Sequence, residues 1–166
     1  MHPFMRFCFE QHVRLPIEVV FGFFQNPSRL EELYEGRPRI RLLHYEKQVR
    51  IGAQTWVEAC VARCIPVVLG FRHHRYEAPV RFGEEAVHGP FSKFVHLHEF
   101  EVRAGGTLMR DLLEICLPWY YGGEWAMRRI VAPMINQMFA KRGGMLNRLV
   151  ERGVLGCEPG SVGKEN

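Results

Sequence analysis

Two histidines and one aspartate are the residues of this chain whose types and spacing could support chemistry. His96 and His98 lie two residues apart in a segment whose residue types alternate with a period of two, and Asp111 lies in the next such segment. Alternate residues of a β-strand point to one face of a sheet, so these three side chains should share a face if the segments pair. Their neighbours at the same parity, such as Phe94 and Ile115, are mostly apolar. This face is therefore expected to look inward.

The glycine pair between the two segments predicts how they align. A two-residue turn at Gly105–Gly106 would place Glu101 opposite Arg110, an opposite-charge pair suited to the outer face. The same register places His98 diagonal to Asp111 on the inner face. A buried carboxylate must find a hydrogen-bond donor, and His98 is the nearest candidate.

Three interpretations of this polar group remain open. The side chains could form a satisfied hydrogen-bonding network within the wall of the fold. They could supply the few convergent polar groups that orient a ligand in an apolar pocket. Finally, His98 and Asp111 could be the catalytic residues of an enzyme, acting as an acid–base pair on a substrate.

The His-x-His spacing also suits a pair of metal ligands on one strand. A third ligand could come from Asp111 or from His73. A zinc site needs close tetrahedral convergence of its ligands, and the sequence does not fix such an arrangement. We therefore predict no metal site and no cofactor.

The rest of the sequence argues against several common functions. It contains no nucleophile elbow, phosphate-binding loop, dinucleotide fingerprint or zinc-protease helix. Hydrophobic residues make up 47% of the 166 residues and charged residues 24%, as in an ordinary globular protein. The net charge of +4 comes from short basic groups spread along the chain, so we expect no nucleic acid partner.

Seven segments have the period of two that is typical of strands. Pro16 ends the first, and short breakers such as Gly89–Pro90 separate the other six. None of those six is separated from the next by enough residues for a crossover helix, which predicts an antiparallel meander. The predicted strands are Phe4–Leu15, Arg39–Val49, Gln54–Cys64, Val67–Ala78, Val80–Val87, Phe94–Arg103 and Thr107–Leu117.

Helices are expected in two places. Apolar residues follow Pro16 at helical spacing as far as Asn26, and SRLEELYEG provides one or two further turns, so two short helices should follow the first strand. Near the C-terminus, apolar residues recur every three or four positions from Ile130 to Val150. This long helix either starts close to Pro133 or starts near Glu124 and is kinked by that proline.

Together these elements predict an α+β fold in which a curved seven-stranded antiparallel sheet wraps around the long C-terminal helix. A curved sheet needs a cover on its concave face, and only the long helix is large enough to provide it. The side chains predicted to line a ligand cavity between sheet and helix are Trp56, Phe71, His73, Phe82, Phe94, His96, His98, Asp111, Ile115, Met134, Met138 and Phe139.

The order of elements and several local phrases resemble the SRPBCC superfamily, which has the START and pollen-allergen-like helix-grip fold. The phrases are LPIEVVFGFFQNPSRLEEL, YEAPVRF, HGPF, FVHLHEFEVRAGGTLMRDLLEICLP and MFAKRGGML, and the resemblance extends from Phe4 to Leu149. It implies the helix-grip fold and a place among the ligand-binding or polyketide cyclase/dehydratase-like members. Glu84, Ala86 and Phe94 depart from the residues that are frequent in such relatives at those positions.

The function that follows is the binding of a small hydrophobic or amphipathic molecule, such as a lipid, quinone, polyketide or aromatic compound, in the internal cavity. The alternative is an enzyme that resembles the cyclase, aromatase or dehydratase members and uses histidine and aspartate in the same cavity for acid–base chemistry. A third interpretation is a domain that binds a partner through its outer face or edge strands, and a homodimer is one such arrangement.

Residues 1–155 are expected to form one ligand-binding domain, followed by a flexible tail at 156–166. The N-terminal segment is too polar for a signal peptide, and no apolar run approaches the ~20 residues of a membrane-spanning helix. The five cysteines are scattered and odd in number, which indicates free thiols in a reducing compartment. We therefore expect a cytoplasmic protein with no integral membrane association.

Overall fold

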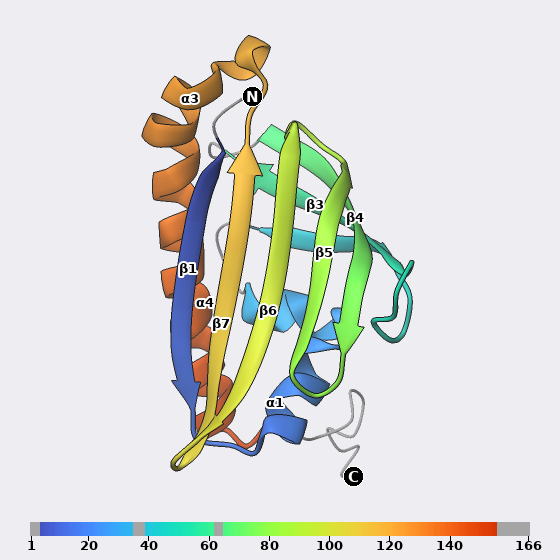
Figure 1. Ribbon diagram of the computed structural model, residues 1–166, viewed down its shortest axis with the longest axis vertical. Helices are drawn as coiled ribbons and strands as arrows, with labels where there is room; N and C mark the ends of the chain where they lie inside the picture. Colours follow the sequence, from blue (N-terminus) through green and yellow to red (C-terminus); the bar gives the residue numbers. More distant parts are fainter. Residues whose placement is uncertain (1–3, 35–38, 62–64, 156–166) are drawn as a thin grey trace, which may run out of the picture.

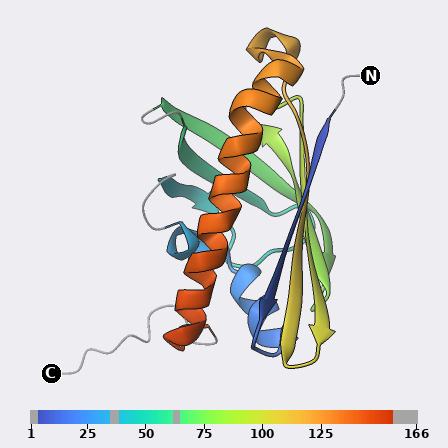
Figure 2. The same ribbon diagram turned by 90° about the vertical axis from the view of Figure 1, so that its left-hand side faces the viewer.

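The computed structural model describes residues 4–34, 39–61 and 65–155. In these residues a seven-stranded sheet curves around a long helix (Figures 1 and 2). This is an α+β fold with the helix-grip arrangement, which confirms the predicted fold class. The predicted tail at 156–166 lies outside the described residues, as do Cys64 and Cys157, and the three described cysteines are free thiols.

All seven predicted strands are present, and every pair of neighbours is antiparallel. The sheet order is β1-β7-β6-β5-β4-β3-β2, so β2 to β7 form the predicted meander and β1 pairs with β7. The strands are β1 (Met5–Val13), β2 (Ile40–Tyr45), β3 (Gln54–Val61), β4 (Ile65–Glu77), β5 (Arg81–His88), β6 (Lys93–Arg103) and β7 (Gly106–Cys116).

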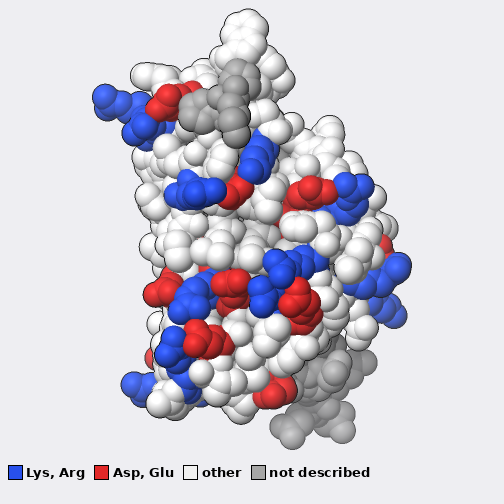
Figure 3. Space-filling model, viewed as in Figure 1, with Lys and Arg blue, Asp and Glu red and all other residues white. Residues whose placement is uncertain are grey.

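The two faces of the sheet differ in chemistry. Along β7, alternate residues from Thr107 to Ile115 are buried on the concave face, and the residues between them are partly exposed. On the outer face, cross-strand ion pairs such as Arg110 with Glu10 join neighbouring strands at 2.6 Å. Figure 3 shows basic and acidic side chains close together across this face. This alternation is what gave the strands their period of two in the sequence.

The turn between β6 and β7 lies one residue earlier than predicted. Arg103 pairs with Gly106, so the two-residue turn is Ala104–Gly105. Asp111 consequently lies directly opposite His98 and not diagonal to it. The partner of each residue shifts by two positions, so parity is unchanged and the inward-facing set remains as predicted.

The second glycine of the pair explains this difference. A Cβ atom built on Gly106 would lie 2.1 Å from the carbonyl oxygen of Val13, at the end of β1. Gly106 therefore permits a close approach of two backbones and does not form the turn. On the outer face the direct neighbour of Arg110 is Glu99, although Glu101 keeps an ion pair of 3.0 Å with Nη1 of Arg110 across the diagonal.

The helices precede and follow the meander. After β1 come α1 (Ile17–Phe24), the 3₁₀ turn η1 (Pro27–Arg29) and α2 (Leu30–Leu33), in the place predicted for two short helices. After β7 come the 3₁₀ turn η2 (Trp119–Tyr121), α3 (Gly123–Ala126), the π-helical segment η3 (Met127–Val131) and α4 (Ala132–Glu151).

The segments α3, η3 and α4 follow one another without a break and form the long helix. Of the two predicted starts, the one near Glu124 is observed. The π-helical turn lies directly before Pro133, which has no N–H to donate to the carbonyl four residues earlier, so the wider turn accommodates the proline. In Figure 2 this helix runs lengthwise in front of the sheet, with β1 and β7 to its right, while β3 and β4 pass behind it and extend to its left.

Two apolar clusters hold the long helix against the sheet. One joins α1 to the C-terminal part of α4 and contains Phe21, Met109 and Leu146. The other joins β7 to the N-terminal part of the helix and contains Leu113 and Ile135. Within the described residues, no helix combines the length and apolar composition needed to cross a membrane.

Candidate ligand-binding site

A cavity of about 1110 Å³ lies between α4 and the concave face of the sheet. This volume lies just above the range for small-molecule pockets, roughly 300–1,000 Å³. Side chains from α1, α2, β2 to β7, η3 and α4 form its wall. Most of the wall is apolar, with contributions from Leu30, Leu33, Val57, Leu69, Phe94 and Met138.

Nine of the twelve side chains predicted for a cavity wall lie in this wall. They are Phe71, His73, Phe82, Phe94, His96, His98, Met134, Met138 and Phe139. They come from β4, β5, β6 and α4, so the pattern of alternation and the helical stripe identified the correct faces of these four elements.

The other three predicted residues do not line the cavity. Trp56 lies on the opposite face of β3, because its neighbours Thr55 and Val57 face the cavity, and its ring lies 5.4 Å from that of His88. Ile115 is fully buried in the apolar core between β7 and the long helix. Asp111 lies behind the wall, in contact with the residues that do line it.

The polar part of the wall is built around Asp111, which is 2% exposed. Its Oδ1 lies 2.9 Å from Nε2 of His96 and 2.7 Å from Nδ1 of His98, and the second contact is poorly aligned for a hydrogen bond. From α4, Arg142 places Nη1 at 3.1 Å from Oδ1 and Nη2 at 3.0 Å from Oδ2. This buried pair ties the helix to β7.

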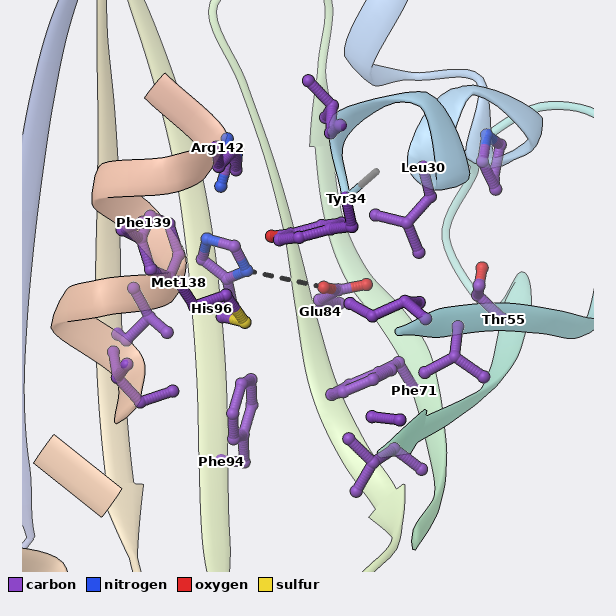
Figure 4. Close-up of a pocket in the computed structure, with 18 of the residues that line it drawn as sticks. Leu30, Tyr34, Thr55, Phe71, Glu84, Phe94, His96, Met138, Phe139 and Arg142 are labelled. Carbon is purple, nitrogen blue, oxygen red and sulfur yellow. Dashed lines mark ion pairs between the residues drawn. The ribbon is translucent and has the colours of Figure 1, made fainter. Parts of the chain in front are cut away.

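A second carboxylate, Glu84, faces the same histidines from β5. The register places His73, Glu84 and His96 side by side on β4, β5 and β6. Oε1 of Glu84 lies 3.5 Å from Nδ1 of His96, the ion pair drawn in Figure 4, and Oε2 lies 3.8 Å from Nε2 of His73. His73 is 3% exposed, and neither of its ring nitrogens has a hydrogen-bond partner among the described residues.

Tyr34 approaches this polar group from the end of α2. Figure 4 shows its ring extending across the cavity, with the hydroxyl directed toward His96. The hydroxyl interacts with the guanidinium of Arg142. That guanidinium also lies over the rings of Phe24 and Phe139, at 5.0 and 4.9 Å from their centroids. The helix α2, the sheet and α4 therefore meet at one polar group.

Both carboxyl groups of this region are ionised at neutral pH. Burial opposes the ionisation of Glu84, but the hydrogen bond with His96 and the field of the three histidines lower its pKa to about 2. Burial also opposes a charge on Asp111, yet Arg142 and His98 hold the pKa of that carboxyl well below its usual value.

The pKa values of the two histidines of β6 shift in opposite directions. Burial lowers the pKa of His96, but its contacts with Asp111 and Glu84 outweigh burial and raise the pKa overall. Burial and the charge of His96 lower the pKa of His98 to about 4, so this ring is neutral. Arg142 and His96 thus face the negative charges of Asp111 and Glu84.

Sequence reasoning missed three residues of this group: Glu84, Arg142 and Tyr34. Glu84 follows Phe82 by two residues, so strand parity points it inward. Arg142 follows Met138 by four residues and lies on the apolar stripe of the helix, where a charged side chain must find a buried partner. Both signals were present in the sequence. No such pattern marks Tyr34, because tertiary packing positions the short helix α2.

Comparison with known proteins identifies the fold. No family model and no curated protein sequence matches the chain. Protein CV1439 from Chromobacterium violaceum has a TM-score of 0.68 at 16% identity, covering 88% of this chain and 96% of that chain. Protein TTHA0849 from Thermus thermophilus has a TM-score of 0.67 at 17% identity, covering 90% and 99%. Ara h 8.0201 has a TM-score of 0.59 at 11% identity, covering 88% and 99%. What these proteins share with the chain is the helix-grip fold.

Proposed function

We propose that this protein binds a small, largely apolar molecule with one polar end in the cavity between α4 and the sheet. The observation that carries this proposal is a space of about 1110 Å³ whose wall is mostly apolar but holds one group of polar side chains. Protein interiors are normally packed without such voids, since an unfilled space forfeits the dispersion contacts of the atoms around it. A cavity of this size is therefore better explained by a ligand than by the needs of the fold.

The arrangement of the wall predicts how such a molecule lies. Its apolar body would pack against side chains such as Leu69, Phe94 and Met138. Its polar end would meet Glu84 and Tyr34, an ionised acceptor and a hydroxyl. A hydroxyl group on the ligand fits both, because it can donate to the carboxylate and accept from the phenol.

Acid–base catalysis in the same cavity is the alternative function. Its support is that neutral His98 lines the cavity and touches Asp111 at 2.7 Å, an arrangement that could move a proton. Should a substrate be identified, His98→Asn would separate the two functions. An acid–base role requires a loss of turnover of about 10²-fold or more with little change in binding, whereas full turnover by the variant would rule it out.

Native mass spectrometry tests the binding proposal. The protein would be measured as purified and again after incubation with a panel comprising a long-chain alcohol, a fatty acid, a quinone and a polycyclic phenol. The proposal predicts one bound molecule per chain for at least one member of the panel, with organic extraction identifying any molecule carried from the host. Folded protein that takes up none of these compounds at one per chain would contradict it.

A further inference from the structure

Three side chains of the cavity wall converge in a way that suits a metal ion. Glu84, His96 and His98 each offer one ligand atom, and these atoms all lie within 4.8 Å of one another. Ligand atoms around a tetrahedral zinc ion are ~3.3 Å apart at bond lengths of ~2.0 Å, so modest side-chain rotations would bring the three together. We propose that Glu84, His96 and His98 bind a divalent first-row transition metal ion.

The strand register supports this set of ligands. Glu84 lies directly opposite His96 on the neighbouring strand, and His98 lies two residues further along β6 on the same face. The sequence offered Asp111 or His73 as the third ligand of the His-x-His pair, whereas the structure brings Glu84 to that place. Two imidazoles with one carboxylate favour zinc, iron or cobalt over magnesium and calcium, which prefer oxygen ligands.

Asp111 has the position of a residue that orients metal-binding histidines. Its Oδ1 contacts Nε2 of His96 and Nδ1 of His98, at 2.9 and 2.7 Å. The opposite nitrogen of each ring is then left for a metal ion, and that of His96 already faces Glu84 at 3.5 Å. Ligating histidines commonly contact a carboxylate through their other nitrogen, which sets the orientation of the ring. Arg142 in turn fixes Asp111 from behind the wall.

His73 provides an independent observation that points to a missing binding partner in the cavity wall. It lies opposite Glu84 on β4 and lines the cavity, yet it is 3% exposed and neither ring nitrogen has a hydrogen-bond partner among the described residues. A buried imidazole without partners loses free energy on folding. With Nε2 at 3.8 Å from Oε2 of Glu84, His73 is placed to become a fourth ligand.

A bound ion would change the chemistry of the cavity. Ligation requires the neutral imidazole, so the ion would compete with protons at the histidines and would add positive charge beside Glu84. Positions not taken by the protein would face the cavity, where an oxygen of a bound molecule could coordinate and be polarised. The ion would then act on the polar end of whatever the cavity holds.

Titration with Co²⁺ tests the site, because cobalt reports its coordination in visible absorption. Full-length protein without an affinity tag would be treated with chelator, freed of it, titrated with Co²⁺ and then challenged with Zn²⁺. Glu84→Gln and His98→Gln would be compared with Glu85→Gln and His74→Gln, which alter the adjacent side chains on the outer face of β5 and β4. Circular dichroism and thermal melting would establish that each variant is folded.

The proposal predicts saturation at one Co²⁺ per chain, displaced by one Zn²⁺. Affinity should fall at least tenfold in Glu84→Gln and in His98→Gln and stay within twofold in both controls. The proposal is wrong if the protein shows no saturable binding, or if all four variants bind alike. If Glu84→Gln does not fold, the affinity of His98→Gln tests the proposal, because His98 is neutral and its replacement removes no charge from the interior. Uptake of an apolar molecule can be measured in the presence of chelator, when no metal ion is bound. The proposed function is therefore tested separately from the metal site.

Discussion

The guanidinium of Arg142 contacts both carboxylate oxygens of Asp111 at 3.0 to 3.1 Å, and the two residues are only 3% and 2% exposed. This pair connects the middle of the long helix to β7 beside the cavity. Removing charges from water is costly, so each partner of such a pair depends on the other for its place in the interior. The same pair supports His96 and His98, which contact Asp111 from the cavity side.

Breaking this pair should destabilise the fold severely. Asp111→Asn leaves Arg142 buried without a counter-charge, which is expected to cost about 3–5 kcal/mol of unfolding free energy. Glu101→Gln, which removes exposed ion pairs with Arg103 and Arg110 on the outer face of the same hairpin, should cost less than about 1 kcal/mol. Urea denaturation of both variants measures the difference.

A double variant guards against the case in which Asp111→Asn fails to fold. Replacing both partners, with Asp111→Leu and Arg142→Met, removes the charges together and should restore much of the stability. If Asp111→Asn and Glu101→Gln unfold at the same urea concentration as the wild type, the pair does not have the role assigned to it.

The two glycines of the β6–β7 hairpin should differ in their tolerance of alanine. At Gly106 a Cβ atom would meet the carbonyl oxygen of Val13 at 2.1 Å, and φ is +154°, so Gly106→Ala should lose about 3 kcal/mol or more. At Gly105 φ is +79° but nothing lies within 4 Å, so Gly105→Ala should lose about 1 kcal/mol. Thermal unfolding of the two variants compares them directly. Equal losses would mean that the approach of β1 is not what requires Gly106.

Tyr34 should titrate at unusually high pH. Burial raises the pKa of its hydroxyl above the ordinary value of 10.0, against the opposing charge of Arg142. Subtracting the ultraviolet absorbance titration of Tyr34→Phe from that of the wild type isolates this group, and the difference should have its midpoint above pH 10. A midpoint at or below 10 would show that the hydroxyl is not held in the wall as described.

The raised pKa of Tyr34 also determines the direction in which ionisation of its hydroxyl changes the stability of the protein. The folded protein binds the Tyr34 proton more tightly than the unfolded chain does, and this difference stabilises the folded state. The stabilisation is fully present below the unfolded pKa of about 10 and is lost as pH rises through the folded pKa. Wild-type stability should therefore fall more steeply than that of Tyr34→Phe in this alkaline range.

Periodicity predicted most of the fold because each element has one buried face. The alternation of β6 and β7 and the stripe of α4 placed Phe94, His96 and Met138 on the correct faces. The register failed at Gly105–Gly106, because a glycine needed for backbone approach resembles a glycine needed for a turn. Trp56 was assigned to the cavity as one of the aromatic residues on the strands, although the parity of β3 places it outside.

The polar group was harder to predict from the sequence, since its residues come from six elements, namely α2, β4, β5, β6, β7 and α4. His96 and His98 were recognisable by their spacing, and the hairpin predicted the face on which Asp111 lies but not its register. Glu84 and Arg142 could have been found by asking which charged residues share parity or helical phase with apolar neighbours. That they meet the histidines depends on how β5 and α4 pack, which no local pattern contains.

The central claim, that the cavity binds an apolar molecule, is tested most directly by filling the cavity and leaving the surface unchanged. Ala59 lines the cavity from β3, and Glu58 lies next to it on the outer face of that strand. Titration with the fluorescent amphipathic probe 1-anilinonaphthalene-8-sulfonate should show one site per chain in the wild type and in Glu58→Trp. The affinity should fall at least tenfold in folded Ala59→Trp. Equal binding by all three proteins, or no saturable binding by the wild type, would contradict the claim.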